Sequence, residues 1–114
     1  MLQLINAERA AVGAGPLTAQ SCPDSFAEPW SPKMAQDGAI SHQSLGPFLS
    51  QCSVSTAAEN VGMTSSQPPE SMMSAFMNSS GHRANILNAA FKGVGIGAYR
   101  DSQGAWWVTQ DFVG

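Results

Sequence analysis

Charge is the scarcest property of this 114-residue sequence, because charged residues make up only 11% of it, against roughly 25% in an ordinary soluble domain. The formal net charge is −3. The few basic residues are scattered along the chain: Arg9, Lys33, Arg83, Lys92 and Arg100. Nucleic acids are bound by clustered basic charge. The composition therefore indicates that nucleic acid is not a partner.

Long apolar runs are missing as well. No stretch approaches the ~20 residues that a membrane-spanning helix needs, so we predict no transmembrane segment. The N-terminus also lacks a basic region followed by an apolar segment, and a helical pattern begins directly at Leu2. We therefore expect that any secretion signal has been removed from this chain.

Cysteine is limited to two residues, Cys22 and Cys52. An even number suggests one disulfide, whereas two unrelated buried thiols are the usual finding in a reducing cytosol. Serine and glutamine neighbours make burial of these cysteines less favourable, so the sequence favours the disulfide. Such a bridge would stabilise the fold by roughly 3 to 4 kcal/mol, and it would indicate an oxidising, extracellular location.

The common local signatures of catalysis are absent. The sequence contains no His-Glu-x-x-His, Gly-x-Ser-x-Gly, P-loop or Cys-x-x-Cys motif, which argues against the usual zinc proteases, serine hydrolases, nucleotide enzymes and redox proteins. The glycine-rich run from Gly93 to Gly97 lies in a strand pattern. Since no helix follows it, it offers no helix N-terminus for a phosphate.

Helical periodicity is present in three segments that lack internal prolines. The first segment carries its apolar face and an arginine stem at Leu2, Ile5, Arg9 and Val12. The second follows Pro68 and Pro69, with its apolar face at Met72, Met73, Phe76 and Met77. The third is a short helical turn from His82 to Leu87. These faces predict helices that pack on a common core.

A further helix is predicted from Ser21 to Gly38, but it contains two prolines. Phe26, Trp30 and Met34 lie four residues apart on one face. Pro29 and Pro32 interrupt this pattern, because proline removes a hydrogen bond and clashes with the preceding turn. We therefore expect a kink, or a restart in which Ser31 is the N-cap and Pro32 the first helical residue.

The chain from Ile40 to Ser66 is rich in serine, threonine and glycine. We predict that most of it is loop, with one helical turn from Leu45 to Leu49. Near the C-terminus the period changes to two, which predicts a β-hairpin around a turn at 101–104 with one buried face. Glycines at 93, 95 and 97 leave one side of the first strand bare. This strip would allow another backbone, or a large side chain such as tryptophan, to approach closely.

The apolar faces together define one predicted core. Its members are Met72, Met73, Phe76, Ile86, Leu87, Val94, Ile96, Val108 and Phe112.

Three residues are candidates for chemistry: His42, Glu59 and His82. Their spacing alone is weak evidence, because a histidine in a loop is usually solvated. Several sequence blocks around them add to it. In order these are Leu4 to Arg9, Gly15 to Leu17, Ser41-His42, Ala58-Glu59-Asn60-Val61-Gly62, Phe76 to Leu87, Val94 to Gly97 and Trp107 to Phe112.

These blocks resemble a short bacterial domain of the cysteine-rich secretory, antigen 5 and pathogenesis-related (CAP) superfamily, over nearly the whole chain. The resemblance implies a single α+β domain over residues 1–114, an α-β-α sandwich with a small antiparallel sheet between helical layers. It also implies a cleft formed by His42, Glu59, Asn60 and His82. Eukaryotic members carry a second cleft glutamate where this chain reads Met77-Asn78-Ser79-Ser80.

The resemblance implies two alternative functions. The first is an extracellular, monomeric binding module that holds a peptide, glycan or lipid of the cell envelope or of a host. The second is a metal-assisted hydrolase of peptide or ester bonds with Glu59 as general base. In both, His42 and His82 would weakly bind Zn²⁺ or another divalent ion, although a hydrogen-bonded network without metal is an equal alternative.

Overall fold

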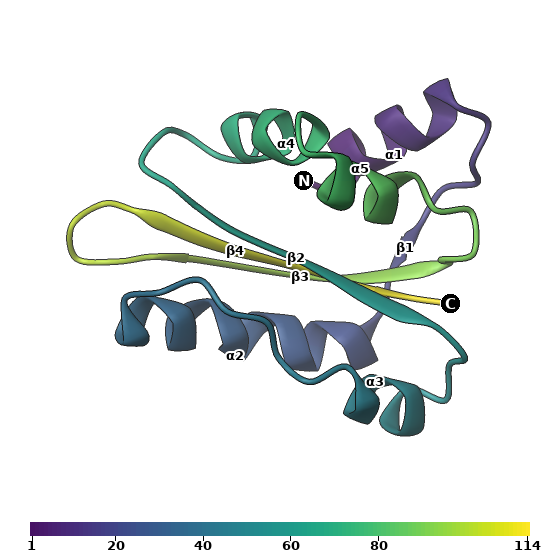
Figure 1. The fold of residues 1–114 in the computed structure, drawn as a ribbon, viewed down its shortest axis with the longest axis horizontal. Helices are drawn as coiled ribbons and strands as arrows, with labels where there is room; N and C mark the ends of the chain where they lie inside the picture. Colours follow the sequence, from purple (N-terminus) through teal and green to yellow (C-terminus); the bar gives the residue numbers. More distant parts are fainter.

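The computed structural model describes residues 1–114 and consists of a four-stranded sheet between two layers of helices (Figure 1). Helices α1, α4 and α5 cover one face of the sheet, and α2 and α3 cover the other. The helices are α1 (Leu2–Ala11), α2 (Ser21–Asp37), α3 (Gly46–Gln51), α4 (Glu70–Met77) and α5 (Ser80–Leu87). The strands are β1 (Thr18–Ala19), β2 (Ala57–Thr64), β3 (Gly93–Arg100) and β4 (Trp106–Val113). The predicted α-β-α sandwich is confirmed.

The strands lie in the order β1-β3-β4-β2. The predicted hairpin is β3 and β4, and β2 pairs antiparallel with the other side of β4 over eight residues. The two-residue strand β1 pairs parallel with β3, so the sheet is antiparallel except for one short edge. None of the five helices combines the length and apolar character that crossing a membrane requires.

Strand β2 was not predicted, since residues 57–64 fall in the segment that we expected to be mostly loop. Its sequence is Ala-Ala-Glu-Asn-Val-Gly-Met-Thr, and most of these residues have low strand propensity. The strand forms because β4 supplies a full antiparallel partner. The prediction of a helical turn near Leu45 to Leu49 is confirmed by α3.

Helix α2 is continuous through Pro29 and Pro32, so the expected restart at Ser31 is wrong. Gly38 ends the helix in the left-handed conformation, as predicted. Packing explains the continuity, because the bare strip of β3 receives the backbone of α2. A Cβ atom at Gly95 or Gly97 would overlap backbone atoms of α2, which shows that a backbone, and not a tryptophan, occupies this strip.

The predicted core is confirmed on the face covered by α1, α4 and α5. Seven predicted members are buried in one cluster, and Leu87 and Ile96 pack against it half-buried. The expectation that the hairpin has one buried face is wrong, because β4 is buried on both faces. Helix α2 covers the second face, where Trp107 packs with Met34 and Val61.

Arg9 is the largest fully buried side chain. Its guanidinium donates to the backbone carbonyls of Gly15, Ile86, Asn88 and Phe91 over 2.7 to 3.2 Å. Burial lowers the pKa of Arg9. These bonds tie α1 to the segment that follows α5.

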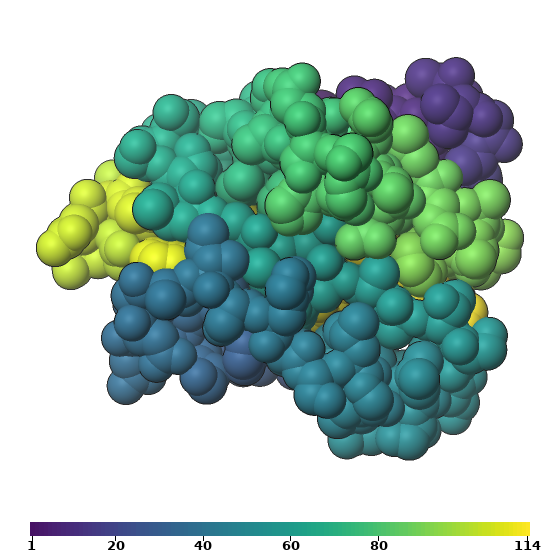
Figure 2. Space-filling view, in the orientation of Figure 1, coloured from purple at the N-terminus to yellow at the C-terminus, as the bar shows by residue number.

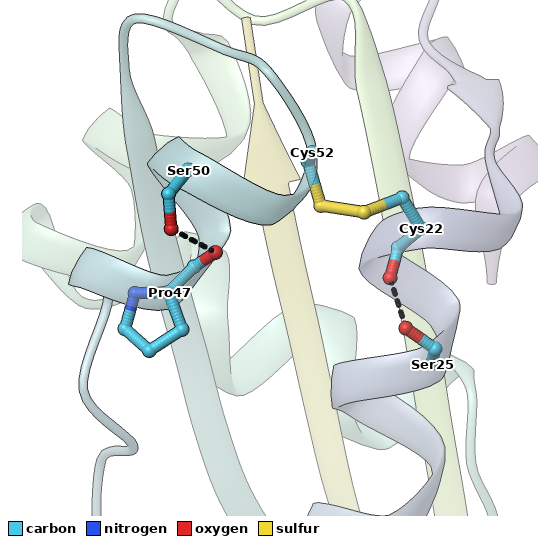
Figure 3. The surroundings of a disulfide bond; sticks show 5 residues. All are labelled: Cys22, Ser25, Pro47, Ser50 and Cys52. Carbon is cyan, nitrogen blue, oxygen red and sulfur yellow. Dashed lines mark hydrogen bonds between the residues drawn. A yellow bond between two sulfur atoms is a disulfide. The ribbon is translucent and has the colours of Figure 1, made fainter.

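The predicted disulfide is present, with 2.04 Å between the sulfur atoms of Cys22 and Cys52 (Figure 3). It links the first turn of α2 to the residue that follows α3. Ser25 donates a hydrogen bond of 2.6 Å to the Cys22 carbonyl beside the bridge. The short helix α3 is therefore held covalently on the α2 side of the sheet.

Candidate functional site

The candidate residues come from three elements that meet at the edge strand β2. His42 lies in the connection between α2 and α3, Glu59 and Asn60 are neighbours on β2, and His82 is in the first turn of α5. Successive side chains of a strand point to opposite faces. Glu59 therefore points toward the α2 layer and Asn60 toward the α5 layer, and each approaches the histidine of its own layer.

Glu59 fixes the orientation of His42. The Nδ1 atom of His42 lies 2.9 Å from Oε1 of Glu59, whose side chain is only 1% exposed, whereas that of His42 is 61% exposed. Gln43 donates its backbone N–H to Oε1 over 3.1 Å and its side-chain amide to Oε2 over 2.8 Å. Because a carboxylate can only accept, the neutral His42 ring carries its proton on Nδ1. Its Nε2 lone pair remains free.

Asp111 completes the polar cluster on this face. It is the register partner of Glu59 across the β2 and β4 pair, and its Oδ2 accepts a 3.0 Å bond from the Gln43 amide. Burial, together with the hydrogen bond and the charge of Glu59, raises the pKa of Asp111 to about 10. Its Oδ1 is buried without any hydrogen-bond partner. The raised pKa favours the protonated form of Asp111.

The sequence did not identify Asp111 or Gln43 as site residues. The strand pattern placed Asp111 on the same face as Trp107 and Thr109, which is correct. Nothing in that pattern showed which strand lies beside β4 on this side, because β2 itself was not predicted. Without that pairing, the opposition of Asp111 and Glu59 was not visible.

His82 is held by a second polar network on the other layer. Its Nδ1 lies 2.9 Å from the Ser79 hydroxyl, and its ring packs against Phe76 with 4.9 Å between centroids. Asn60 donates to the His82 carbonyl over 3.2 Å and accepts from the Asn85 amide over 2.9 Å. Burial, and secondarily the charge of His42, lowers the pKa of His82.

The donor set at β2 is limited to two imidazole nitrogens. No group of three or more histidine, cysteine, aspartate or glutamate side chains is arranged to hold a metal ion. Glu59 is already bonded by His42 and Gln43, so its position is that of a carboxylate that orients a histidine. These residues alone therefore do not form a complete metal site.

The candidate site is an open groove and not an enclosed cavity. Figure 2 shows a hollow between the green layer of α4 and α5 and the blue layer of α2, with teal atoms of β2 along its floor. The two cavities of the molecule lie elsewhere. One of about 350 Å³ is lined by residues of α1 and α4, and one of about 400 Å³ lies beside the turn of the β3 and β4 hairpin.

Comparison with known proteins gives one consistent result. The profile of the cysteine-rich secretory protein family (CAP) matches residues 2–112. The uncharacterized protein YkwD of Bacillus subtilis strain 168 is 36% identical over 121 residues, which cover 100% of this chain and 46% of YkwD. The chain thus spans about half the length of that relative.

Solved structures show the same fold. An extracellular protein containing a SCP domain from Bacillus anthracis (strain Ames) superposes with a TM-score of 0.83 at 27% identity, over 98% of this chain and 38% of that protein. A cysteine-rich secretory protein from Staphylococcus aureus (Mu50) superposes with a TM-score of 0.80 at 22% identity, over 98% of this chain and 36% of that protein. Both matches cover nearly all of this chain and less than half of the relative.

Proposed function

We propose that this chain, which belongs to the cysteine-rich secretory protein (CAP) family, is an extracellular binding module whose groove between His42 and His82 holds a ligand of the cell envelope or of a host. The observation that carries the proposal is the convergence of two histidines from opposite layers on one edge strand. Each has a polar partner on its Nδ1 atom. Each ring therefore presents its other nitrogen as a recognition group.

An extracellular location is supported by two independent observations. The disulfide of this chain requires oxidising conditions to persist, and no free cysteine remains. The relative from Bacillus anthracis is described as an extracellular protein. We therefore infer that the module works outside the cytoplasm, and we expect it to be monomeric.

A divalent ion such as Zn²⁺ is a proposed component of this site. His42 and His82 would hold it, and Glu59 would orient His42 without contacting the ion. The ion would supply a positive charge in the groove for an anionic or carbonyl group of the ligand. With two protein ligands, the affinity is expected to be low and to depend on the solution conditions.

The geometry favours binding over hydrolysis. Glu59 was the candidate general base, but its side chain is 1% exposed. Both of its oxygens already accept hydrogen bonds from His42 or Gln43. A general base must reach the proton that it removes within hydrogen-bond distance. We therefore propose that Glu59 positions His42 and does not activate water.

The test is a calorimetric titration with zinc at pH 7.5 of the wild type, His42→Ala, His82→Ala and the double variant. If the histidines act together, each single substitution abolishes binding nearly as fully as the double one, because one imidazole is a poor site. Affinity should also fall at acidic pH, because protons compete with the ion for the imidazole nitrogens. Glu8→Gln, on the exposed side of α1, is the control and should bind like the wild type. Zinc binding that survives the double substitution would contradict the proposal.

A further inference from the structure

Strand β2 is an edge strand whose outer side has almost no hydrogen-bond partners. Thr56 and Gly114 form a hydrogen-bonded pair, in which each donates its backbone N–H to the carbonyl of the other. In an antiparallel ladder such pairs alternate with pairs that share no hydrogen bond, so this pair fixes which residues of β2 bond to β4. Even-numbered residues of β2 therefore direct their N–H and C=O groups toward β4. Odd-numbered residues, namely Ala57, Glu59, Val61 and Met63, direct theirs outward. Only the Glu59 carbonyl among these has a protein partner, the Asn85 amide at 3.4 Å.

The two edge strands of the sheet differ in length and in their protection against pairing with another strand. The opposite edge, β1, has only two residues, and a very short edge strand is a common protection against unwanted pairing. Strand β2 pairs with β4 over eight consecutive residues without a bulge. It contains no proline, lysine or arginine. The long edge thus has no bulge, proline or basic side chain to protect it, although it is the edge that borders the two histidines.

This edge is also recessed. Glu59, Asn60 and Val61 are at most 5% exposed although they lie at the margin of the sheet. The connection that carries His42 and Gln43 contacts β2 from one layer, and α5 contacts it from the other. The hollow seen in Figure 2 follows this strand. A second copy of the chain, whose own edge is equally recessed, would be blocked by these walls.

A single extended peptide is the occupant that fits these features. Its backbone can pair with the outward N–H and C=O groups of Val61 and Met63, as in recognition by strand addition. Its side chains would point alternately toward the connection that carries His42 and toward helix α5, which carries His82. At about 3.3 Å per residue, the segment from Ala57 to Met63 accommodates a peptide of similar length.

We infer that the groove binds an extended peptide backbone, which adds as a fifth strand to the outer edge of β2 between His42 and His82. The inference rests on the proposed binding function and names its ligand class. In this arrangement the backbone of β2 supplies the affinity. The connection that carries His42 and the helix α5 that carries His82 supply the selectivity. A folded protein surface or a sugar ring would leave the outward ladder unpaired.

The experiment uses a library of capped linear heptapeptides, and measures binding to the wild-type protein by fluorescence polarisation. The tightest binder is then N-methylated at each position in turn. Pairing with β2 predicts a pattern of period two, in which methylation at alternate positions weakens binding roughly tenfold or more and methylation at the others has little effect. This scan leaves the protein unchanged, so its result does not depend on the folding of a variant.

The matching protein variant is Met63→Pro, which removes one outward N–H group. Met63 is 45% exposed, and its N–H does not serve the ladder with β4, so a proline is compatible with the edge. It should weaken the peptide roughly five- to tenfold. Met63→Val keeps the N–H group and is the control, with affinity expected close to that of the wild type.

The outcomes separate this inference from the proposed function. Peptide binding that needs both histidines but shows no period of two would overturn the inference and leave the binding module standing. If glycans or lipids bind and peptides do not, the inference is likewise overturned and the binding module still stands. A dimer that Met63→Pro dissociates would assign the edge to a second copy and overturn the inference. If no ligand class binds, the proposed function and the inference both fail.

Discussion

The two faces of the sheet are built on opposite principles. The face under α1, α4 and α5 carries a continuous apolar cluster that includes Met72, Phe76 and Phe112. The face under α2 carries the glycines at 93, 95 and 97 and a buried hydrogen bond of 2.8 Å between Ser31 and Thr109. It also carries the polar cluster of Glu59, Gln43 and Asp111. Apolar burial is the main source of stability, whereas buried polar groups are useful only when fully bonded. The comparison indicates that the first face contributes most of the apolar stabilisation, and that the second holds the buried carboxyl groups beside His42.

The largest effect is expected from Phe76→Ala on the apolar face. Phe76 is 1% exposed and lies against the ring of His82. Truncation of a buried aromatic leaves a cavity and should reduce the free energy of unfolding by about 3 to 5 kcal/mol. Urea denaturation measures this loss. Tyr99→Ala, at a residue that is 42% exposed, is the control, and a loss below about 1 kcal/mol for Phe76→Ala would contradict the assignment of the core.

A somewhat smaller effect is expected when the covalent link on the polar face is removed. Cys22 and Cys52 are 30 residues apart, and closing a loop of that length should stabilise the fold by roughly 3 to 4 kcal/mol. The double variant Cys22→Ala/Cys52→Ala should lose this amount in urea denaturation. Mass spectrometry of the unreduced protein provides the check, because two alkylatable thiols in native material would show that the bridge does not form.

The third effect concerns Asp111 and depends on pH. Burial and the charge of Glu59 raise the pKa of Asp111 from its ordinary value of 3.8 to about 10 in the folded chain. Between these values the folded state binds more protons, so this residue lowers the free energy of unfolding as pH rises. Asp111→Asn keeps the shape and removes the titration. Relative to the wild type, its free energy of unfolding should rise as the pH increases from 4 to 8.

Asp37→Asn is the control for this experiment, because Asp37 is half-exposed and pairs only with Lys33 on the surface of α2. It should show no comparable gain with rising pH. Urea denaturation at several pH values measures both variants. An equal response of Asp37→Asn and Asp111→Asn would remove the distinction between a buried and a solvated carboxyl group.

The apolar face was predictable from the sequence, because periodicity reports burial directly. The spacing of Met72, Phe76 and Val108 identified the core, and the family resemblance identified His42, Glu59 and His82. The polar face was less predictable. Strand β2 exists because β4 pairs with it, and the continuity of α2 through Pro29 depends on its packing against the glycine strip of β3.

Long-range pairing also explains why the carboxyl pair was missed. Glu59 and Asp111 are 52 positions apart in the sequence and become neighbours only through the register of β2 with β4. Neither residue is unusual by itself. Local patterns therefore predicted which side chains are buried, but they did not predict which buried polar groups meet.

The raised pKa of Asp111 is the most direct consequence of the polar face, because a protonated Asp111 leaves Glu59 as the buried acceptor that orients His42. Carbon-13 chemical shifts of the side-chain carboxyl groups, measured from pH 3 to pH 9, report this proton residue by residue. We predict that Asp111 keeps the shift of a protonated carboxyl group up to at least about pH 8. Titration of Asp111 near 4 would show that it does not hold a buried proton beside Glu59. It would contradict the claim that Glu59 is the ionised carboxylate that orients His42.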